Sequence, residues 1–397
     1  MPGAPSVLKL TLVLGCLSAF GPLSIDMYLP AFPHITRDLR APDGAVEFTL
    51  AAFLLGTAAG QLVYGPLADR FGRRRPLLAG CGIYALGALI CALASSMGLF
   101  TAARVVQALG GAAGMVIARA VVRDLFDERE AARMFSQLML VMGVTPVLAP
   151  WLGGQILAFA NWRMIFYLLT GFGLFCLLMS ARFLPETLPD ARRARGGLPA
   201  TLRDFGRLLR DRRFLGYTLV AGFGAGTLFA YIAGSPYVFI QLHHVSEQRF
   251  GLFFGLNAAG FIGAAQFNRW LLHRCSPEAI LPAATGGGLV AGLLLALCGA
   301  TGWGGLPAFA ALLFACLSML GVAGPNIAAA ALAPFGRAAG SASALLGTAQ
   351  FLLGALAGGF VGLFHNGTAF PMSATVAAAS AGGYLALRTL ARPRPAG

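Results

Sequence analysis

Two charged residues lie inside long apolar runs of the sequence, where a charge is costly. Asp26 falls near the end of the first apolar run, and Arg104 falls near the start of the fourth. A charge at the centre of a membrane-spanning helix costs roughly 2.5 to 3.5 kcal/mol on insertion scales, so such residues are functional candidates. Because the first and fourth runs would be crossed in opposite directions, we expect the two side chains to reach similar depth.

An acid and a guanidinium at one depth can pair in one conformation and separate in another. Desolvation and the loss of a positive neighbour both favour the protonated acid, so separating Asp26 from Arg104 would couple proton uptake to a change of shape. Gln107 lies one helical turn beyond Arg104 on the same face. A static salt bridge between the first and fourth runs is the alternative. Glu47 is expected to be solvated, because it lies close to where the second run begins.

Composition indicates which elements must position these residues. Of the 397 residues, 57% are hydrophobic and 11% are charged, with a mean hydropathy of +0.75. Soluble domains carry about 25% charged residues. The apolar residues come in runs of about twenty, the length that a helix needs to cross hydrocarbon. The sequence therefore predicts an all-α membrane protein of about twelve transmembrane helices in two six-helix bundles.

The predicted spans follow the apolar runs between charged or Pro- and Gly-containing breaks. They lie near 8–29, 45–66, 76–96, 99–122, 134–159, 162–184, 214–240, 250–272, 278–300, 304–333, 338–363 and 368–390. Most of the 29 basic residues fall in loops on one side, and Arg37, Arg40, Arg163 and Arg249 fall on the other. The positive-inside rule then places both termini in the cytoplasm. The net charge of +14 therefore does not indicate nucleic-acid binding.

The longest predicted loop divides the chain into two halves. We expect an N-terminal bundle at 1–184, a cytoplasmic linker at 185–213 and a C-terminal bundle at 214–397. Within the linker, Leu202 and Phe205 share a helical face opposite arginines, which favours a partly amphipathic helix in the headgroup region. A solvated linker is the alternative. Two equal halves suggest a substrate site between them near mid-membrane.

A specific motif lies between the second and third spans. It reads Gly65-Pro66-Leu67-Ala68-Asp69-Arg70-Phe71-Gly72-Arg73-Arg74-Arg75. An acid at a helix end can pair with arginines and with neighbouring helix termini, while glycine permits close approach. The segment resembles the cytoplasmic signature of the major facilitator superfamily. The resemblance implies a conformational latch formed by Gly65, Asp69, Arg70, Gly72, Arg73 and Arg74. An ordinary positive-inside anchor is the alternative.

Other segments resemble one branch of that superfamily, the bicyclomycin/chloramphenicol resistance (Bcr/CflA) drug:proton antiporters. They are Pro22 to Pro30, Arg104 to Gln107, Pro146 to Gly154 and Ser235 to Ile240. The resemblance implies that Asp26 responds to protons and that Arg104 modulates it. Ala108 and Ala149 depart from the family pattern, which has glycine at both positions.

The fifth span carries a Pro and Gly frame that is expected to bend its helix. Pro146, Pro150, Gly153 and Gly154 form this helix-bend motif. Proline and glycine bend a helix and leave backbone carbonyls open to other partners. A structural kink without a coupling role is the alternative.

Several polar and aromatic residues are expected to line the substrate cavity. The second half has no charge that we place deep in the membrane, so it would supply apolar and aromatic surface. The expected cavity residues are Tyr28, Gln107, Arg119, Phe229, Tyr231 and Tyr237. Arg119 could equally extend its side chain to the membrane interface.

The sequence therefore predicts a proton-coupled exporter of small amphiphilic compounds, such as bicyclomycin- or phenicol-like antibiotics, working by alternating access. A dedicated exporter of an amino acid or other metabolite is the nearest alternative, and a receptor or an intramembrane hydrolase the more distant ones. A hydrolase would need a nucleophile and a base at one depth, and Ser341, Ser343 and His365 do not supply them. We expect no enzyme activity, cofactor or metal. The expected partners are substrate, protons and lipid, for a monomer in a bacterial inner membrane.

Overall fold

The computed structural model describes residues 7–189, 197–335 and 339–391, and these ranges consist of helices joined by short turns. The first half contains α1 (Val7–Ser18), α2 (Phe20–Asp26), the 3-10 turn η1 (Leu29–Ala31), α3 (Phe32–Asp38), α4 (Ala45–Phe71), α5 (Arg74–Leu93), α6 (Met97–Leu125), α7 (Glu128–Phe159) and α8 (Arg163–Phe183). The second half contains α10 (Arg212–Pro236), the π turn η3 (Tyr237–Leu242), α11 (Glu247–Leu271), α12 (Pro277–Thr301), α13 (Gly305–Leu332), α14 (Ala339–Leu363) and α15 (Phe370–Thr389).

Eleven helical segments of the described ranges are long and apolar enough to cross a membrane. Helix α15 is the twelfth long segment, with 20 residues. The predicted all-α membrane fold is confirmed.

The first span differs from its predicted form because it is not one helix. The predicted span was 8–29, whereas the apolar segment runs from Lys9 to Asp38 and has 30 residues. It is divided into α1, α2, η1 and α3. Pro30 and Pro33 stand at the starts of η1 and α3, where the missing N–H does least harm. Asp26 is the last residue of α2, so the acid lies at a break in the span.

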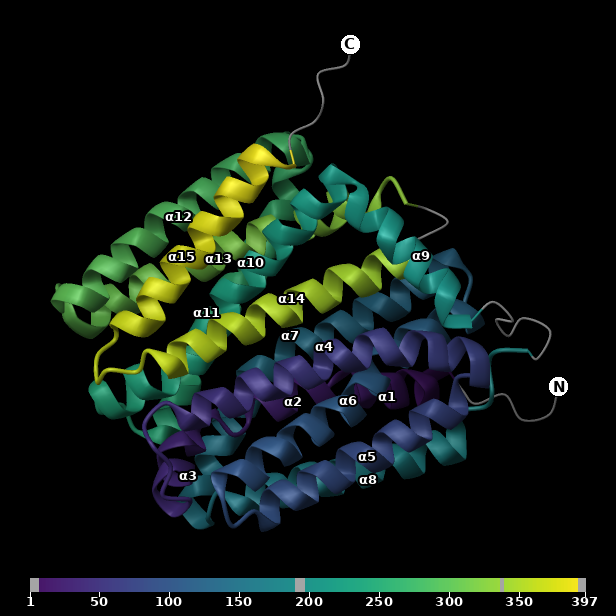
Figure 1. Cartoon of the computed structure of the whole chain (residues 1–397), viewed down its shortest axis with the longest axis horizontal. Coiled ribbons are helices and arrows are strands. Elements are labelled where there is room, and N and C mark those ends of the chain that lie inside the picture. Colours follow the sequence, from purple (N-terminus) through teal and green to yellow (C-terminus); the bar gives the residue numbers. More distant parts are fainter. Residues whose placement is uncertain (1–6, 190–196, 336–338, 392–397) are drawn as a thin grey trace.

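The helices form two groups, one from each half of the chain (Figure 1). Helices α1 to α8 lie together in the lower part of the view, and α10 to α15 lie together in the upper part. The groups meet where α4 packs against α14 and where α7 packs against α11. Helix α9 (Gly197–Arg210) lies at one end and contacts α4, α10 and α14. The predicted division into domains stays a prediction, and its positions 190–196 lie outside the described residues.

The two halves touch closely at the end that carries α3, which we call the outer end after the predicted orientation. Gly44 has a φ of 80°, and a side chain there would overlap the carbonyl of Gly362 in the other half. Nearby, His34 Nε2 lies 2.7 Å from Glu247 Oε1, which joins α3 to α11. The outer end is therefore closed in this conformation.

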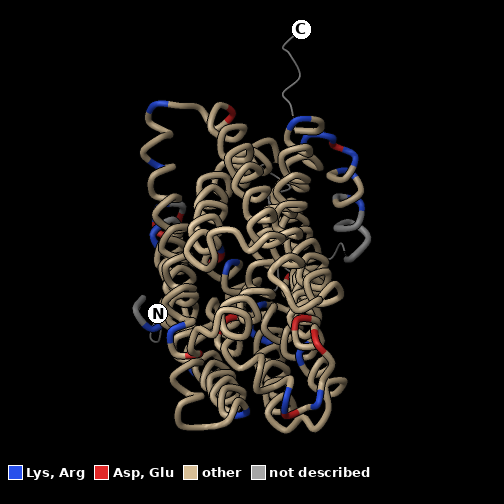
Figure 2. Tube along the Cα trace, turned by 90° about the vertical axis from the view of Figure 1, so that its left-hand side faces the viewer, with Lys and Arg blue, Asp and Glu red and all other residues tan. Residues whose placement is uncertain are grey.

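The opposite, inner end collects the ends of both halves. Lys9 Nζ lies 5.2 Å from the ring centroid of Phe183, which brings the start of α1 to the end of α8. Gly216, near the start of α10, packs against Leu390 just after α15. Seen from its left-hand side in Figure 1, most of the trace carries no charge (Figure 2). That the inner end faces the cytoplasm stays a prediction.

Candidate functional site

Arg104 lies wholly inside the first half, with 0% of the residue exposed. Its Nη1 donates to Gln107 Oε1 at 2.6 Å, and its Nη2 donates to the carbonyl oxygen of Ser24 at 2.9 Å. Gln107 can meet Arg104 because residues three apart are neighbours on a helix surface. Ser24 belongs to α2, so the guanidinium ties α6 to the helix that ends at Asp26.

Three aromatic rings surround the same guanidinium. Its Cζ lies 4.3 Å from the ring centroids of Tyr28 and Phe53 and 5.7 Å from that of Phe166. The negative face of an aromatic ring attracts a cation, and this attraction is strongest where water is excluded. Tyr28 is held in place because its hydroxyl lies 3.2 Å from Thr49 Oγ1. The rings thus stabilise a buried positive charge without a carboxylate.

Asp26 is also buried, at 3% exposure. In the described part of the chain, no ion pair or hydrogen bond reaches its carboxylate. The predicted pair of Asp26 with Arg104 is thus not formed in this conformation. That the two residues pair in another conformation stays a prediction.

A second buried acid corrects the sequence analysis. Glu47 was expected to be solvated, yet it is only 7% exposed. A side chain added at Gly362 would stand 3.1 Å from Glu47 Cβ, so α14 covers the start of α4 here. The expectation was wrong because the covering helix comes from the other half of the chain, which the local sequence does not show.

The surroundings of Arg104 include two residues that the sequence analysis did not select. Ser24 Oγ and Tyr84 Oη lie 2.7 Å apart. Arg104 Nε and Gln107 Nε2 are buried and have no hydrogen-bond partner within the described residues. Tyr84 comes from α5, and no spacing in the sequence connects it with α2. The first half therefore holds a polar cluster with N–H groups still available.

The expected cavity residues of the second half lie near α11 and α14. Asn257 Nδ2 donates to Tyr231 Oη at 3.2 Å, and the Phe254 ring stacks on Tyr231 with centroids 5.2 Å apart. Asn257 was not predicted, although an amide in the middle of an apolar helix was a usable signal. The Phe229 ring lies 5.9 Å from that of Phe351.

The remaining expected cavity residues do not share one place. Tyr237 contacts His365 at the outer end, with ring centroids 4.3 Å apart. Tyr28 and Gln107 are enclosed around Arg104 in the first half. Arg119 is exposed on α6, where its Nε donates to the carbonyl oxygen of Met115 at 2.9 Å. Substrate contact by these residues stays a prediction.

The latch motif forms a network at the inner end of the first half. Arg73 Nε donates to Asp124 Oδ2 at 2.8 Å, and Arg73 Nη1 donates to Asp69 Oδ1 at 2.5 Å. Burial lowers the pKa of Arg73, but its bonds to Asp124 and Asp69 outweigh burial and raise the pKa above the usual value. The arginine therefore stays charged. Asp124 of α6 was not predicted as a partner.

Glu186 completes the latch, and the sequence analysis did not select it. Its Oε1 accepts from the backbone N–H of Arg73 at 2.8 Å, and its Oε2 accepts from that of Arg74 at 3.2 Å. Gly72 precedes them with a φ of 85°, and a side chain there would overlap the Glu186 carboxylate. Glycine is thus required at position 72 for two reasons, the positive φ and the close approach of Glu186. In contrast, Gly65 has open space around it. Arg70 lies beside the ring of Phe71, 5.3 Å from its centroid.

The helix-bend motif lies within α7, which continues through both Pro146 and Pro150. A side chain at Gly153 would overlap the carbonyl oxygen of Met27, and one at Gly154 would overlap that of Glu247. Adjacent glycines therefore admit two backbones, one from the first span and one from the other half. The motif is a contact point between the halves, next to Asp26.

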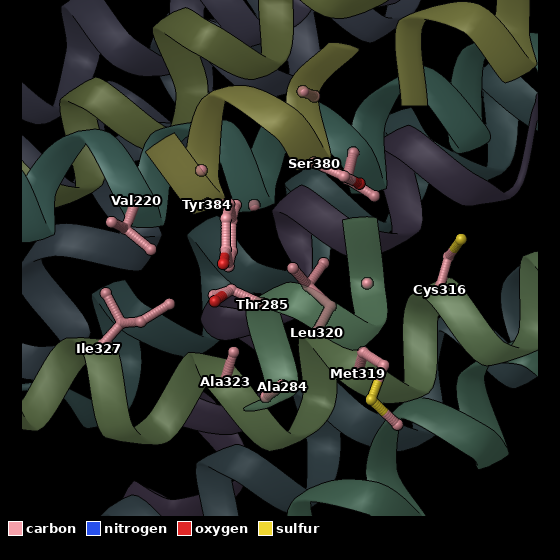
Figure 3. A pocket seen from close by; sticks show the side chains of 15 residues that line it. Val220, Ala284, Thr285, Cys316, Met319, Leu320, Ala323, Ile327, Ser380 and Tyr384 are labelled. Carbon is pink, nitrogen blue, oxygen red and sulfur yellow. The ribbon is translucent and has the colours of Figure 1, made fainter. Parts of the chain in front are cut away.

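A separate pocket lies inside the second half, between α10, α12, α13 and α15 (Figure 3). Thr285 and Tyr384 point toward one another across it, beside Leu320. Its lining contains none of the expected cavity residues. The pocket therefore lies apart from Asp26 and from the Arg104 cluster.

Comparison with known proteins identifies the family. The Major Facilitator Superfamily matches residues 14–359. The "Uncharacterized MFS-type transporter YdgK" of Bacillus subtilis is 38% identical over 99% of this chain and 98% of its own length. The "Bicyclomycin resistance protein homolog" of Haemophilus influenzae is 35% identical over 92% of both chains. The "Multidrug resistance protein MdtL" of Escherichia coli is 29% identical over 83% of this chain and 82% of its own length.

Solved structures share the fold. A D-xylose-proton symporter superposes with a TM-score of 0.74 at 15% identity, covering 97% of this chain and 98% of its own. A bacterial homolog of the human lysosomal transporter Spinster superposes with a TM-score of 0.73 at 20% identity, covering 98% of both. The chain belongs to the Major Facilitator Superfamily and is a multi-pass membrane transporter, not an enzyme. The predicted resemblance to the bicyclomycin resistance branch is confirmed.

Proposed function

We propose that this transporter exchanges protons for small amphiphilic compounds and exports them from the bacterial cytoplasm across the inner membrane. No cofactor enters the cycle, because the proton gradient supplies the free energy. A single chain holds both halves of the site, and they rock about it in alternating access.

The observation that carries this proposal is the buried carboxylate of Asp26, which has no partner among the described residues. A buried carboxylate without a partner favours its neutral, protonated form. Arg104 is tied to the helix that carries Asp26, because it donates to the carbonyl oxygen of Ser24 in α2. Its Nε keeps a free N–H, which is the donor that an ionised carboxylate would need. A change of shape that brings Asp26 to this donor would release the proton.

The substrate class follows from the polarity of the surroundings. The second half offers Tyr231, Asn257 and several phenylalanines, and the first half offers the Asp26 carboxylate. Such a site suits a compound with both apolar and hydrogen-bonding groups. Relatives named for bicyclomycin and multidrug resistance support drugs of this kind. Export of an amino acid or other metabolite is the second candidate, because the same contacts accept it.

Proton release by the purified protein tests the proposal. We expect a neutral phenicol added to wild-type protein in weakly buffered detergent to release protons, and Asp26→Asn to release none. The asparagine has nearly the same volume, so binding should persist and can be measured separately by calorimetry. Accumulation against a gradient in proteoliposomes should vanish with the same variant.

Glu47→Gln provides the matched control, because Glu47 is the other acid that the described residues of the first half show as buried. It should release protons on phenicol addition as wild type does. Proton release that survives in Asp26→Asn and is lost in Glu47→Gln would assign coupling to Glu47 instead. A panel of cations and neutral compounds in an efflux-deficient host would identify the preferred substrates.

A further inference from the structure

A pocket at the outer end of the first half gathers three arginines. The pocket and the open solvent at its mouth together occupy about 840 Å³. The residues that line it are His34, Arg37, Asp38, Arg40, Asn161, Trp162 and Arg163. They come from α3 and from the turn that starts α8. None of them belongs to the proposed proton and substrate site.

One of the three arginines is neutralised within the pocket. Asp38 Oδ2 accepts hydrogen bonds from Arg163 and, at 3.0 Å, from Trp162 Nε1. In the described residues, neither Arg37 nor Arg40 has a hydrogen-bonding or ion-pair partner for its side chain. The pocket therefore keeps two positive charges that the protein does not balance.

The backbone places one of these charges at some cost. Arg40 has a φ of 48°, in the left-handed region where glycine is favoured. Its N–H bonds the carbonyl of Arg37, and the N–H of Ala41 bonds that of Thr36, which closes α3 in the usual glycine-type cap. An arginine at this position brings a guanidinium to the pocket where glycine would make the easier helix end.

Exposed apolar side chains lie next to the pocket, at the end of α7 and the start of α8. Phe159, at the end of α7, is 89% exposed. The first two turns of α8 below the pocket expose Met164, Tyr167 and Leu168. Trp162 is buried beneath the pocket, where its ring packs on Phe100 and Phe166 and its Nε1 bonds Asp38. A bound group can therefore place its charge among the arginines and its apolar part along α8.

We propose that this pocket binds the phosphate of an anionic phospholipid, with Arg37 and Arg40 on the phosphate and the acyl chains along α8. Arginine suits this role because its planar group donates two parallel hydrogen bonds to phosphate oxygens. Each basic residue near a membrane surface contributes about fivefold to the attraction of anionic lipid. The lipid would hold α3, and with it His34, which bonds the second half.

Native mass spectrometry of the full-length protein in delipidating detergent tests the proposal. Dioleoyl phosphatidylglycerol is titrated against wild type and Arg37→Gln/Arg40→Gly, and dioleoyl phosphatidylcholine serves as the zwitterionic probe. Glycine suits the backbone at position 40, so the variant should fold as wild type does. We expect the variant to bind phosphatidylglycerol about thirtyfold more weakly and to lose the preference over phosphatidylcholine.

Arg249→Gln is the matched control, since Arg249 is exposed on the outer end but does not line the pocket. It should bind phosphatidylglycerol within about twofold of wild type, less than the effect of one charge at the pocket. Equal binding by all three proteins would overturn the proposal. Displacement of the lipid by millimolar inorganic phosphate or by glycerophosphoglycerol would also overturn it, because the pocket would then be a site for soluble anions.

Discussion

Arg104 reaches the carbonyl oxygen of Ser24 at 2.9 Å, two residues before Asp26 in the same helix. The guanidinium thus holds the backbone next to the acid, while the carboxylate itself has no partner in the described structure. Asp26 is the last residue of α2, so its side chain can reorient at the helix end while Arg104 keeps its bond to Ser24. The link between proton and shape can therefore reside in one short segment.

The aromatic rings around Arg104 should contribute to stability through its charge. Phe53→Leu should lower the free energy of unfolding by about 1 to 2 kcal/mol more than Phe100→Leu, because only Phe53 faces the guanidinium. Both phenylalanines are fully buried, and Phe100 contacts Trp162 and Phe166 instead. Thermal unfolding in detergent gives the comparison. Equal losses would mean that packing alone stabilises this cluster.

The latch should depend more on Asp124 than on Asp69. Asp124 accepts hydrogen bonds from Arg73 and from Thr187, whereas Asp69 is half exposed and bonds Arg73 within its own segment. Asp124→Asn should slow turnover about fivefold or more, and Asp69→Asn less, while substrate affinity changes little in both. Transport rates and binding measured on the same preparations check this. A larger effect of Asp69→Asn would place the controlling contact outside this network.

Two glycines of one motif should respond differently to alanine. Gly72→Ala should destabilise the inner end by about 1 to 3 kcal/mol, because it strains the backbone and displaces Glu186. Gly65→Ala should be neutral or slightly stabilising, since its surroundings are open and alanine favours helix. The unfolding temperature and the transport activity of both variants test this difference. Similar behaviour of the two would remove the special role of Gly72.

Gly154 of α7 should be needed for the approach of the two halves. Gly154→Ala adds a methyl group against the carbonyl oxygen of Glu247 in the other half, so the outer end should open and transport should fall. Gly153→Ala adds its methyl group against Met27 of its own half, so its outer distance should stay closer to that of wild type. Gly171→Ala in α8 is the control, because nothing lies within 4 Å of the added group. Spin labels on Asn161 and Asn366, in a background without the exposed Cys275, report the outer distance. An unchanged distance in all three variants would contradict this expectation.

The His34 and Glu247 contact should favour the closed outer end. Glu247→Gln removes the charge but keeps a side chain that can bond His34, so the outer end should open in a larger fraction of molecules. The same spin-label pair measures that fraction. A distribution that matches wild type would show that the backbone contacts between Gly44 and Gly362 suffice.

Much of the fold could be predicted because its cause is local. A run of about twenty apolar residues must be helical in a membrane, whatever surrounds it. The motif residues were likewise visible, since Asp69 and Arg73 are four apart and lie at the end of α4 and the start of α5. Asp26 and Arg104 could be placed at similar depth from the direction of their spans alone.

The rest of the site depends on contacts between distant segments. Glu186 lies 113 residues from Arg73, and only the packing of α5 and α8 brings them together. Glu47 is buried by a helix of the other half. The direction of Arg104 depends on rings from α4 and α8, and no spacing within α6 indicates whether it turns to Ser24 or to Asp26.

The fixed guanidinium has an electrical consequence. An arginine keeps its proton throughout, so protonation of Asp26 changes the combined charge of Asp26 and Arg104 from zero to plus one. One elementary charge gains about 2.3 kcal/mol per 100 mV when it crosses the membrane field. Under the proposed coupling, voltage acts on the proton-loaded form and leaves the deprotonated, substrate-carrying form unaffected. For a neutral drug, the membrane potential thus drives the step in which the proton-loaded transporter returns to the inward-facing state. It does not drive the export step itself.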